Sequence, residues 1–187
     1  MLIMVTPRKF CRFNKGDSLS LGVPDPTSLT LKEIPDGGFC LSSFLVALRR
    51  DDHSKVLMGL INPSAPWDHI GALDEQRVIR FGKGWMLPSS HLIYGETPSD
   101  AASRIAGEQL GLDLKFGNPI VASDTYVPKT SKKNDTHWDI QFIFRFELEQ
   151  NSISANPNWE KLDFIDYRKS LNQITRYHED VLRSAGL

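Results

Sequence analysis

The fold of this chain is decided by the stretch Ser89-Ser90-His91-Leu92-Ile93-Tyr94-Gly95-Glu96-Thr97-Pro98-Ser99-Asp100-Ala101-Ala102-Ser103-Arg104-Ile105-Ala106-Gly107-Glu108-Gln109-Leu110-Gly111-Leu112. Thr97 carries a hydroxyl that can cap a helix, and Pro98 follows at the first helical position, where its missing N–H does no harm. Asp100 places a carboxylate near the positive end of the helix dipole. The stretch therefore predicts a loop followed by a helix from Pro98 to about Leu110, which ends at Gly111.

These residues resemble the Nudix box, a motif of a glycine, a loop glutamate and a helix that carries an arginine and three glutamates. The loop glutamate falls on Glu96, the arginine on Arg104, one helix glutamate on Glu108 and the closing glycine on Gly111. The resemblance implies that Glu96 and Arg104 pair to hold the loop and the helix together; two unrelated surface charges are the alternative. It also implies that the helix glutamates carry Mg²⁺ or Mn²⁺ and help to activate water.

Three positions depart from the motif, because Ser90 stands at the glycine, Ile105 at the first helix glutamate and Gln109 at the last. Positions 105, 108 and 109 are related as i, i+3 and i+4, so we expect them to project from one stripe of the helix and to converge on a cation. Only Glu108 supplies a charged oxygen there, and Mg²⁺ usually takes one or two carboxylates together with water and phosphates. Glu108 is therefore the candidate metal ligand and a candidate catalytic residue of a weak or absent Mg²⁺ (or Mn²⁺) site. A solvated helix glutamate is the alternative.

Hydrophobic alternation predicts strands on both sides of this helix. The strands are expected at Phe39–Leu48, Lys55–Ile61, Ile120–Val127, His137–Leu148 and Trp159–Asp166. In the fourth strand the even positions are apolar and the odd positions largely polar, although Ile143 interrupts the polar face. A closing helical region is predicted from Tyr167 to Ala185. Together the elements predict a fold of the α/β (α+β) class, a Nudix-like mixed β-sheet sandwiched between helices.

The chain has 187 residues, which suits one domain with an appendage. Residues 1–38 alternate short apolar pieces with turn formers, and we expect an N-terminal extension packed on the main domain. Residues 39–187 form the predicted Nudix-like domain. The segment 62–84 is long for a connection, and long loops inside compact domains tend to be functional or mobile.

The composition argues against several classes of protein. There are 22 basic and 23 acidic residues, a formal charge of −1, so we expect no nucleic-acid partner. No apolar run approaches the roughly 20 residues of a spanning helix, and the first residues do not have the pattern of a signal peptide. We therefore expect a cytoplasmic protein without a membrane partner. Cys11 and Cys40 lack the paired spacing of a zinc site and are expected to be buried or inert thiols; a disulfide is neither required nor excluded.

Several side chains near loops are candidates for contact with a ligand. Ser89, Ser90 and His91 precede the box helix and could contact substrate phosphates. Trp67 and Tyr126 could stack on a nucleobase, which contributes on the order of 1–3 kcal/mol per base. An aromatic side chain is more often part of the core, and that is the alternative for both.

His137 follows a second loop and is a candidate catalytic acid or base, with Asp139 two residues on. In Nudix enzymes this loop can provide an additional carboxylate or base, so the resemblance supports the assignment. A plain polar strand face is the alternative for both residues.

Two functions are open on this reading. The first is a metal-dependent hydrolase of a nucleoside diphosphate derivative, such as a nucleotide sugar, with weakened or lost activity. The second is a catalytically inactive Nudix-fold nucleotide-binding or regulatory protein. Both imply a small-molecule nucleotide or nucleotide-sugar ligand, and a homodimer is the common habit of the family. A titration with Mg²⁺ or Mn²⁺ would separate the two.

Overall fold

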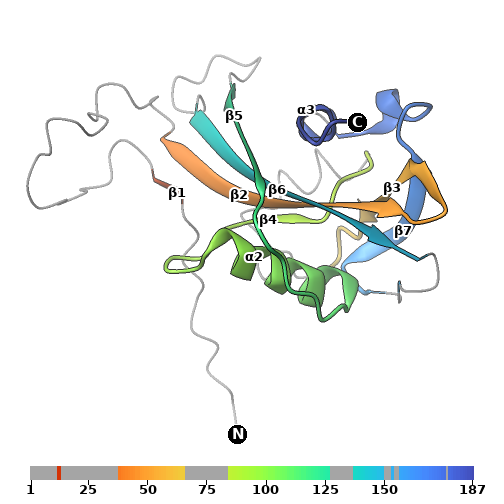
Figure 1. Cartoon of the computed structure of the whole chain (residues 1–187), viewed down its shortest axis with the longest axis horizontal. Helices are drawn as coiled ribbons and strands as arrows, with labels where there is room; N and C mark the ends of the chain where they lie inside the picture. Colours follow the sequence, from red (N-terminus) through yellow and green to blue (C-terminus); the bar gives the residue numbers. More distant parts are fainter. Residues whose placement is uncertain are drawn as a thin grey trace, which may run out of the picture.

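The computed structural model describes residues 12–13, 38–65, 84–126, 137–149, 153, 156–175 and 177–187, with the backbone alone for residues 12–13 and 124–126. In this part of the chain seven strands form one sheet (Figure 1). The strands are β1 (Arg12–Phe13), β2 (Phe39–Arg49), β3 (Asp52–Ile61), β4 (Ser89–His91), β5 (Ile120–Tyr126), β6 (His137–Leu148) and β7 (Trp159–Asp166).

The sheet is mixed, with the strand order β5-β6-β2-β3-β7 and with β1 and β4 paired to β2 beside this path. β2 and β6 run parallel in an uninterrupted register, and the other strand pairs are antiparallel. The predicted fold class is confirmed. The sequence did not predict β4, because three residues are too few to show an alternating pattern.

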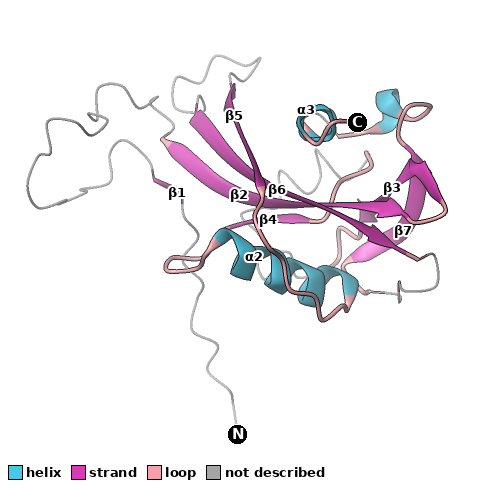
Figure 2. Cartoon of the chain, viewed as in Figure 1, coloured by secondary structure: helices cyan, strands magenta, loops and turns pink. Residues whose placement is uncertain are grey.

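Helices lie on both faces of this sheet (Figure 2). The first is α2 (Pro98–Ile105), which continues as a π-helical turn over Ala106–Leu110, and the second is α3 (His178–Ser184). We call the two sides of the sheet the α2 face and the α3 face. The cluster on the α2 face contains Leu45, Ala47, Leu57, Ala102, Ile105, Ala106, Leu110, Phe144, Leu148 and Phe164. The cluster on the α3 face includes Val46, Leu48, Val56, Met58, Trp85, Leu87, Ile143, Val181 and Leu182.

The box helix begins and ends where the sequence predicts. The Thr97 hydroxyl accepts from the Asp100 N–H at 3.2 Å, which is the expected cap. Gly111 ends the π-helical turn with φ 69, in the left-handed region that glycine adopts without strain. The π-helical turn is the one feature of this helix that residue spacing did not indicate, and such turns are frequent at functional sites.

The predicted closing helix is wrong in its first half. Residues 171–173 form a 3₁₀ turn, and α3 begins only at His178. Between them the backbone pairs with Trp85, because the Trp85 N–H donates to the Gln173 carbonyl at 2.8 Å and the Thr175 N–H donates to the Trp85 carbonyl at 2.9 Å. A Cβ at Gly84 would lie 2.6 Å from the Thr175 hydroxyl oxygen, so this close approach requires glycine.

The odd positions of β6 lie on the α3 face, where the first four are buried or partly buried and the last two, Arg145 and Glu147, are exposed. Ile143 lies in the cluster on the α3 face, and Arg145 Nη1 donates to the Ala185 carbonyl at 3.1 Å. Gln141 and His137 are buried as well. The apolar interruption at Ile143 in the sequence therefore marks the place where α3 packs.

Two predictions lie mostly outside the described residues. Of the N-terminal extension, the structure describes β1 and Gly38, so its separation from residues 39–187 stays a prediction, and residues 66–83 of the long connection are also outside. In the described ranges, no helix combines the length and the apolar character that crossing a bilayer requires. A cytoplasmic location stays a prediction.

Candidate functional site at the box helix

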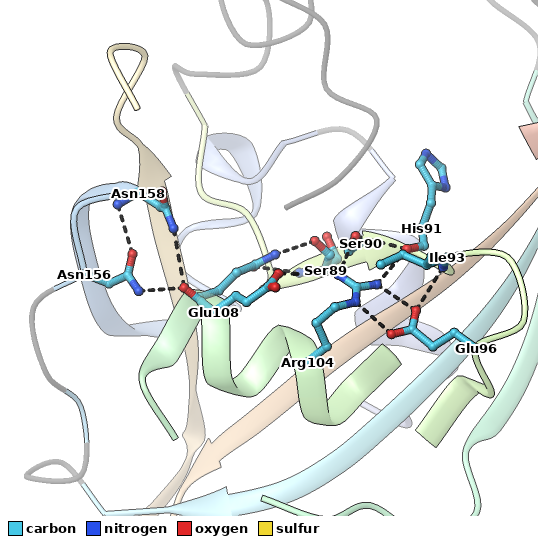
Figure 3. A network of polar contacts seen from close by, with 10 residues as sticks. Ser89, Ser90, His91, Ile93, Glu96, Arg104, Glu108, Asn156 and Asn158 are labelled. Carbon is cyan, nitrogen blue, oxygen red and sulfur yellow. Dashed lines mark hydrogen bonds and ion pairs between the residues drawn. The ribbon is translucent and has the colours of Figure 1, made fainter. Parts of the chain in front are cut away.

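Glu96 and Arg104 form a bidentate ion pair between the loop and α2 (Figure 3). Arg104 Nε lies 2.8 Å from Glu96 Oε1, and Nη2 lies 2.9 Å from Oε2. Both side chains are 13% exposed. Glu96 also accepts from the Ile93 N–H at 2.9 Å, and Arg104 donates to the His91 carbonyl at 3.0 Å. The pair therefore joins β4, the loop and the helix, as the resemblance implied.

Gln109 holds the outer edge of β4 with its side chain. Its amide oxygen accepts from the Ser89 N–H at 3.1 Å, and its amide nitrogen donates to the Ser89 carbonyl at 2.8 Å. The residue is 1% exposed, and its own carbonyl accepts from Trp159 Nε1 at 2.9 Å. A carboxylate could not donate to the Ser89 carbonyl. This hydrogen bond therefore explains structurally why a glutamine, and not a glutamate, stands at this box position.

Ile105 faces the sheet and not the edge of β4. It is completely buried in the cluster on the α2 face. Glu108, three residues on, keeps a side chain that is 28% exposed. The single stripe that we expected from residues 105, 108 and 109 is therefore not formed: one position is core, one is partly exposed, and Gln109 is bound to the β4 backbone.

Glu108 is the one carboxylate among the three positions, and it already has a cationic neighbour. Its Oε2 lies 3.6 Å from Arg104 Nη1. Its backbone carbonyl accepts from Asn156 Nδ2 at 2.8 Å and Asn158 Nδ2 at 3.4 Å, which ties the loop before β7 to the end of the helix (Figure 3). Residue spacing could not indicate these asparagines, because they lie 48 and 50 residues from Glu108 along the chain.

Nudix hydrolases generally use divalent metal ions. A cluster of such ions needs several carboxylates to compensate its charge. At the three box positions this chain offers Glu108 beside Arg104, the amide of Gln109 bound to Ser89, and the buried Ile105. These residues do not fit a metal cluster on the box helix.

The polar side chains of β4 form hydrogen bonds within the chain. Ser89 Oγ donates to the Leu87 carbonyl, and Ser90 Oγ donates to the His91 carbonyl, both at 3.1 Å. The Nδ1 atom of His91 lies 2.9 Å from Ser42 Oγ on β2. Their roles in substrate binding stay predictions, which would require these hydroxyls to exchange partners or the His91 ring to bind through its other nitrogen.

The remaining candidates are not brought to the box helix. His137 starts β6, where its Nε2 lies 3.4 Å from Asp139 Oδ1. By strand alternation His137 lies on the α3 face, whereas Glu108 belongs to the helix on the other face. Trp67 and the side chain of Tyr126 lie outside the described residues.

A buried histidine that sequence reasoning missed lies on the α3 face. His178 Nδ1 accepts from the Leu87 N–H at 2.9 Å, and its ring contacts Phe44 edge to face. Burial lowers the pKa of His178 to about 4, so the ring is neutral at physiological pH. No local pattern could have revealed it, because the two partners are 91 residues apart.

No protein-family profile matches the chain. Among curated proteins, the RNA pyrophosphohydrolases of Vibrio cholerae and of Vibrio vulnificus strain YJ016 are each 25% identical over 121 residues, which cover 57% of this chain and 70% of each relative.

The solved structures give the fold. The MutT protein of Methanosarcina mazei Go1 superposes with a TM-score of 0.54 at 13% identity, over 85% of this chain and 97% of that one. The Nudix domain of Shewanella oneidensis NrtR, solved with ADP ribose, gives 0.55 at 12% identity, over 87% and 92%. A C. elegans Ap4A hydrolase gives 0.51 at 13% identity, over 79% and 95%.

The mixed sheet between helices, with a loop glutamate bound to a helix arginine, defines the Nudix class of fold. This chain has that fold, and its sequence is similar to pyrophosphohydrolases of the Nudix type.

Proposed function

We propose that this chain binds a nucleoside diphosphate derivative, such as a nucleotide sugar, beside the box loop, and that it hydrolyses the phosphoanhydride bond slowly or not at all. The observation that carries the proposal is the fate of the three box carboxylates. Glu108 alone is left, and it faces Arg104. Without charge compensation for bound divalent ions, the transition state of pyrophosphate cleavage loses its main source of stabilisation.

The chain retains structural features that support ligand binding. The Glu96 and Arg104 pair still fixes the loop against the helix. The NrtR domain was solved with ADP ribose, and the Ap4A hydrolase is named for a dinucleotide, so nucleotide-derived ligands suit this fold. The Vibrio relatives are named for action on RNA, which makes a 5′-triphosphorylated RNA the one nucleic acid to include in a test.

The test is a panel of ligands for which both binding and product formation are measured. ADP-ribose, a GDP-sugar, nucleoside triphosphates, a dinucleoside polyphosphate and a short 5′-triphosphorylated RNA would be titrated by calorimetry with and without Mg²⁺ or Mn²⁺. Product would be followed by chromatography. We expect binding of a diphosphate derivative that changes little with metal, and slow or absent turnover.

Glu108→Gln is the matched variant for this test. It removes the remaining carboxylate and keeps the side-chain shape, so binding of the ligand should persist. Rapid metal-dependent turnover that Glu108→Gln abolishes would show an active hydrolase and contradict the proposed loss. Rapid turnover that persists in the variant would move the chemistry away from the box helix, and His137 and Asp139 would be the next residues to change.

A further inference from the structure

We propose that Cys40, His137 and Asp139 form a binding site for Zn²⁺ on the α3 face of the sheet. Their ligand atoms, the thiol sulfur, an imidazole nitrogen and a carboxylate oxygen, all lie within 4.8 Å of one another. In the part of the chain that the structure describes, this is the one group of three such side chains close enough to share an ion.

The backbone brings these residues together although β2 and β6 are about a hundred residues apart in sequence. Cys40 is opposite Asp139 in the parallel register of β2 and β6, and His137 lies two residues before Asp139 on the same side of the strand. Uninterrupted pairing from Phe39 to Arg49 holds this placement. The arrangement is therefore built on the first residues of two paired strands of the sheet.

The chemistry of the three donors selects the kind of ion. Thiolate and imidazole favour zinc and other softer transition metals, whereas Mg²⁺ prefers oxygen donors alone. Three protein ligands leave the fourth tetrahedral position open, which is the pattern of zinc sites that also bind water or a substrate. Ser42 and Gln141, the next register pair along the same two strands, lie on the same face and are buried.

Distances and burial are compatible with an ion. Zn–S bonds are about 2.3 Å and Zn–N or Zn–O bonds about 2.0–2.2 Å, so tetrahedral ligands lie roughly 3.3–3.7 Å apart. His137 Nε2 and Asp139 Oδ1 are already 3.4 Å apart. Cys40 and His137 are buried and Asp139 is 24% exposed, which leaves a solvent-facing side for the ion to enter.

The site is separate from the box helix. By strand alternation Cys40 and His137 lie on the α3 face, whereas Glu108 belongs to the π-helical turn that continues α2 on the other face. Zinc binding and nucleotide binding can therefore be tested independently, and loss of one leaves the other proposal standing.

Cobalt is the probe for this site, because Co²⁺ replaces Zn²⁺ in thiolate sites and is coloured. The full chain would be stripped with a chelator, dialysed and titrated with Co²⁺. We expect a thiolate-to-cobalt charge-transfer band in the near ultraviolet, visible bands of tetrahedral intensity, saturation at one ion per chain, and loss of all of them when Zn²⁺ is added.

The chain offers matched controls. It has two cysteines, so Cys40→Ser should abolish the charge-transfer band and Cys11→Ser should keep it. Asp139→Asn should weaken Co²⁺ binding by about 100-fold, since loss of a partner outside the ligand set already costs roughly 10–100-fold. His53→Gln, at an exposed histidine, should leave the charge-transfer band and the Co²⁺ affinity unchanged.

Each result decides the proposal. No charge-transfer band in the parent chain, or a band that survives in Cys40→Ser, would overturn it and leave the three residues as an ordinary hydrogen-bonded group. If circular dichroism shows that Cys40→Ser is unfolded, Asp139→Asn decides instead, because Asp139 is partly exposed and the change preserves its shape. Unaltered Co²⁺ affinity in that variant would also overturn the proposal.

Discussion

The two faces of the sheet bury different kinds of side chain. On the α2 face, β2 and β6 contribute Leu45, Ala47, Phe144 and Leu148 to an apolar cluster with the box helix. On the α3 face the same two strands also bury Cys40, Ser42, His137 and Gln141, and α3 adds His178. Each face thus uses one parity of the same strands, and the α3 face buries more of their polar side chains than the α2 face, where Ser43 Oγ donates to the Pro98 carbonyl at 3.1 Å.

The difference separates the apolar side chains that stabilise the fold from the polar side chains that are able to bind a ligand or an ion. Apolar burial on the α2 face supplies stability without any directional requirement. Buried polar groups on the α3 face need specific partners, because an unmade hydrogen bond in the interior costs free energy. Catalysis would be expected at the box helix in this fold. Here Ile105 of that helix packs in the apolar cluster, and the side chain of Gln109 hydrogen-bonds to the backbone of β4.

The largest effect is expected from a carboxylate placed in the apolar cluster on the α2 face. Ile105→Glu returns the residue of the motif, but here it would bury a charge among apolar side chains. The free energy of unfolding should fall by about 4 kcal/mol or more. Ile105→Val is the control and should cost about 0.5–1.5 kcal/mol. Urea unfolding of both variants measures this, and a parent-like midpoint for Ile105→Glu would mean that the helix can turn this side chain to solvent.

Sequence reasoning succeeded where the pattern is local and repeated. The capped helix and the limits of β6 and β7 follow from residue types alone. It failed where the backbone makes long-range pairs, as at Ile174, which bridges to Trp85 instead of continuing a helix. The stripe of residues 105, 108 and 109 failed for a different reason, because helical spacing does not say which side packs on the sheet.

The site could be predicted only in part for the same reason. The motif named Glu96 and Arg104, and the structure shows their ion pair. It could not name the partners of Gln109 and His178, which are Ser89 and Leu87, since contacts between distant segments leave no periodic signal.

Acid should test the polar face through His178. Its pKa is about 4 in the folded chain against 6.5 for an unperturbed histidine. Between these values the unfolded chain binds a proton that the folded chain does not, so stability is complete above pH 6.5 and falls as pH decreases. The loss should approach about 3 kcal/mol near pH 4.

His178→Gln isolates this contribution, because the amide can still accept from Leu87 and does not titrate. The difference in unfolding free energy between parent and variant should shrink from pH 7 to pH 4. The contributions of the carboxylates to the pH dependence are the same in both proteins and cancel in this difference. An equal slope in His178→Gln would show that His178 is solvated.

The ion pair between the loop and the helix should give a somewhat smaller effect. Removing one partner of a buried pair costs about 3–5 kcal/mol, and the partial exposure of Glu96 and Arg104 reduces this to about 2–3 kcal/mol. Glu96→Gln and Arg104→Met should each lose that much in chemical unfolding, and the double variant should lose less than the sum. Arg183→Met, at an exposed pair with Asp180, should be almost neutral. Additive losses would show that Glu96 and Arg104 do not interact.

The smallest effect is expected for Gln109→Glu. This variant also tests most directly whether position 109 has a structural role or is a metal site. At pH 7 the new carboxylate would face the Ser89 carbonyl without a proton to donate, at a cost of about 1–3 kcal/mol. Burial raises the pKa of such a carboxyl, and the protonated form can donate again, so the variant should regain stability as the pH falls. Gln109→Leu, which has no titratable group, should show a loss that does not depend on pH. If Gln109→Glu is as stable as the parent at pH 7 and binds Mg²⁺ more tightly, then this position is a metal site that lacks only its charge, and the structural role argued for Gln109 is wrong.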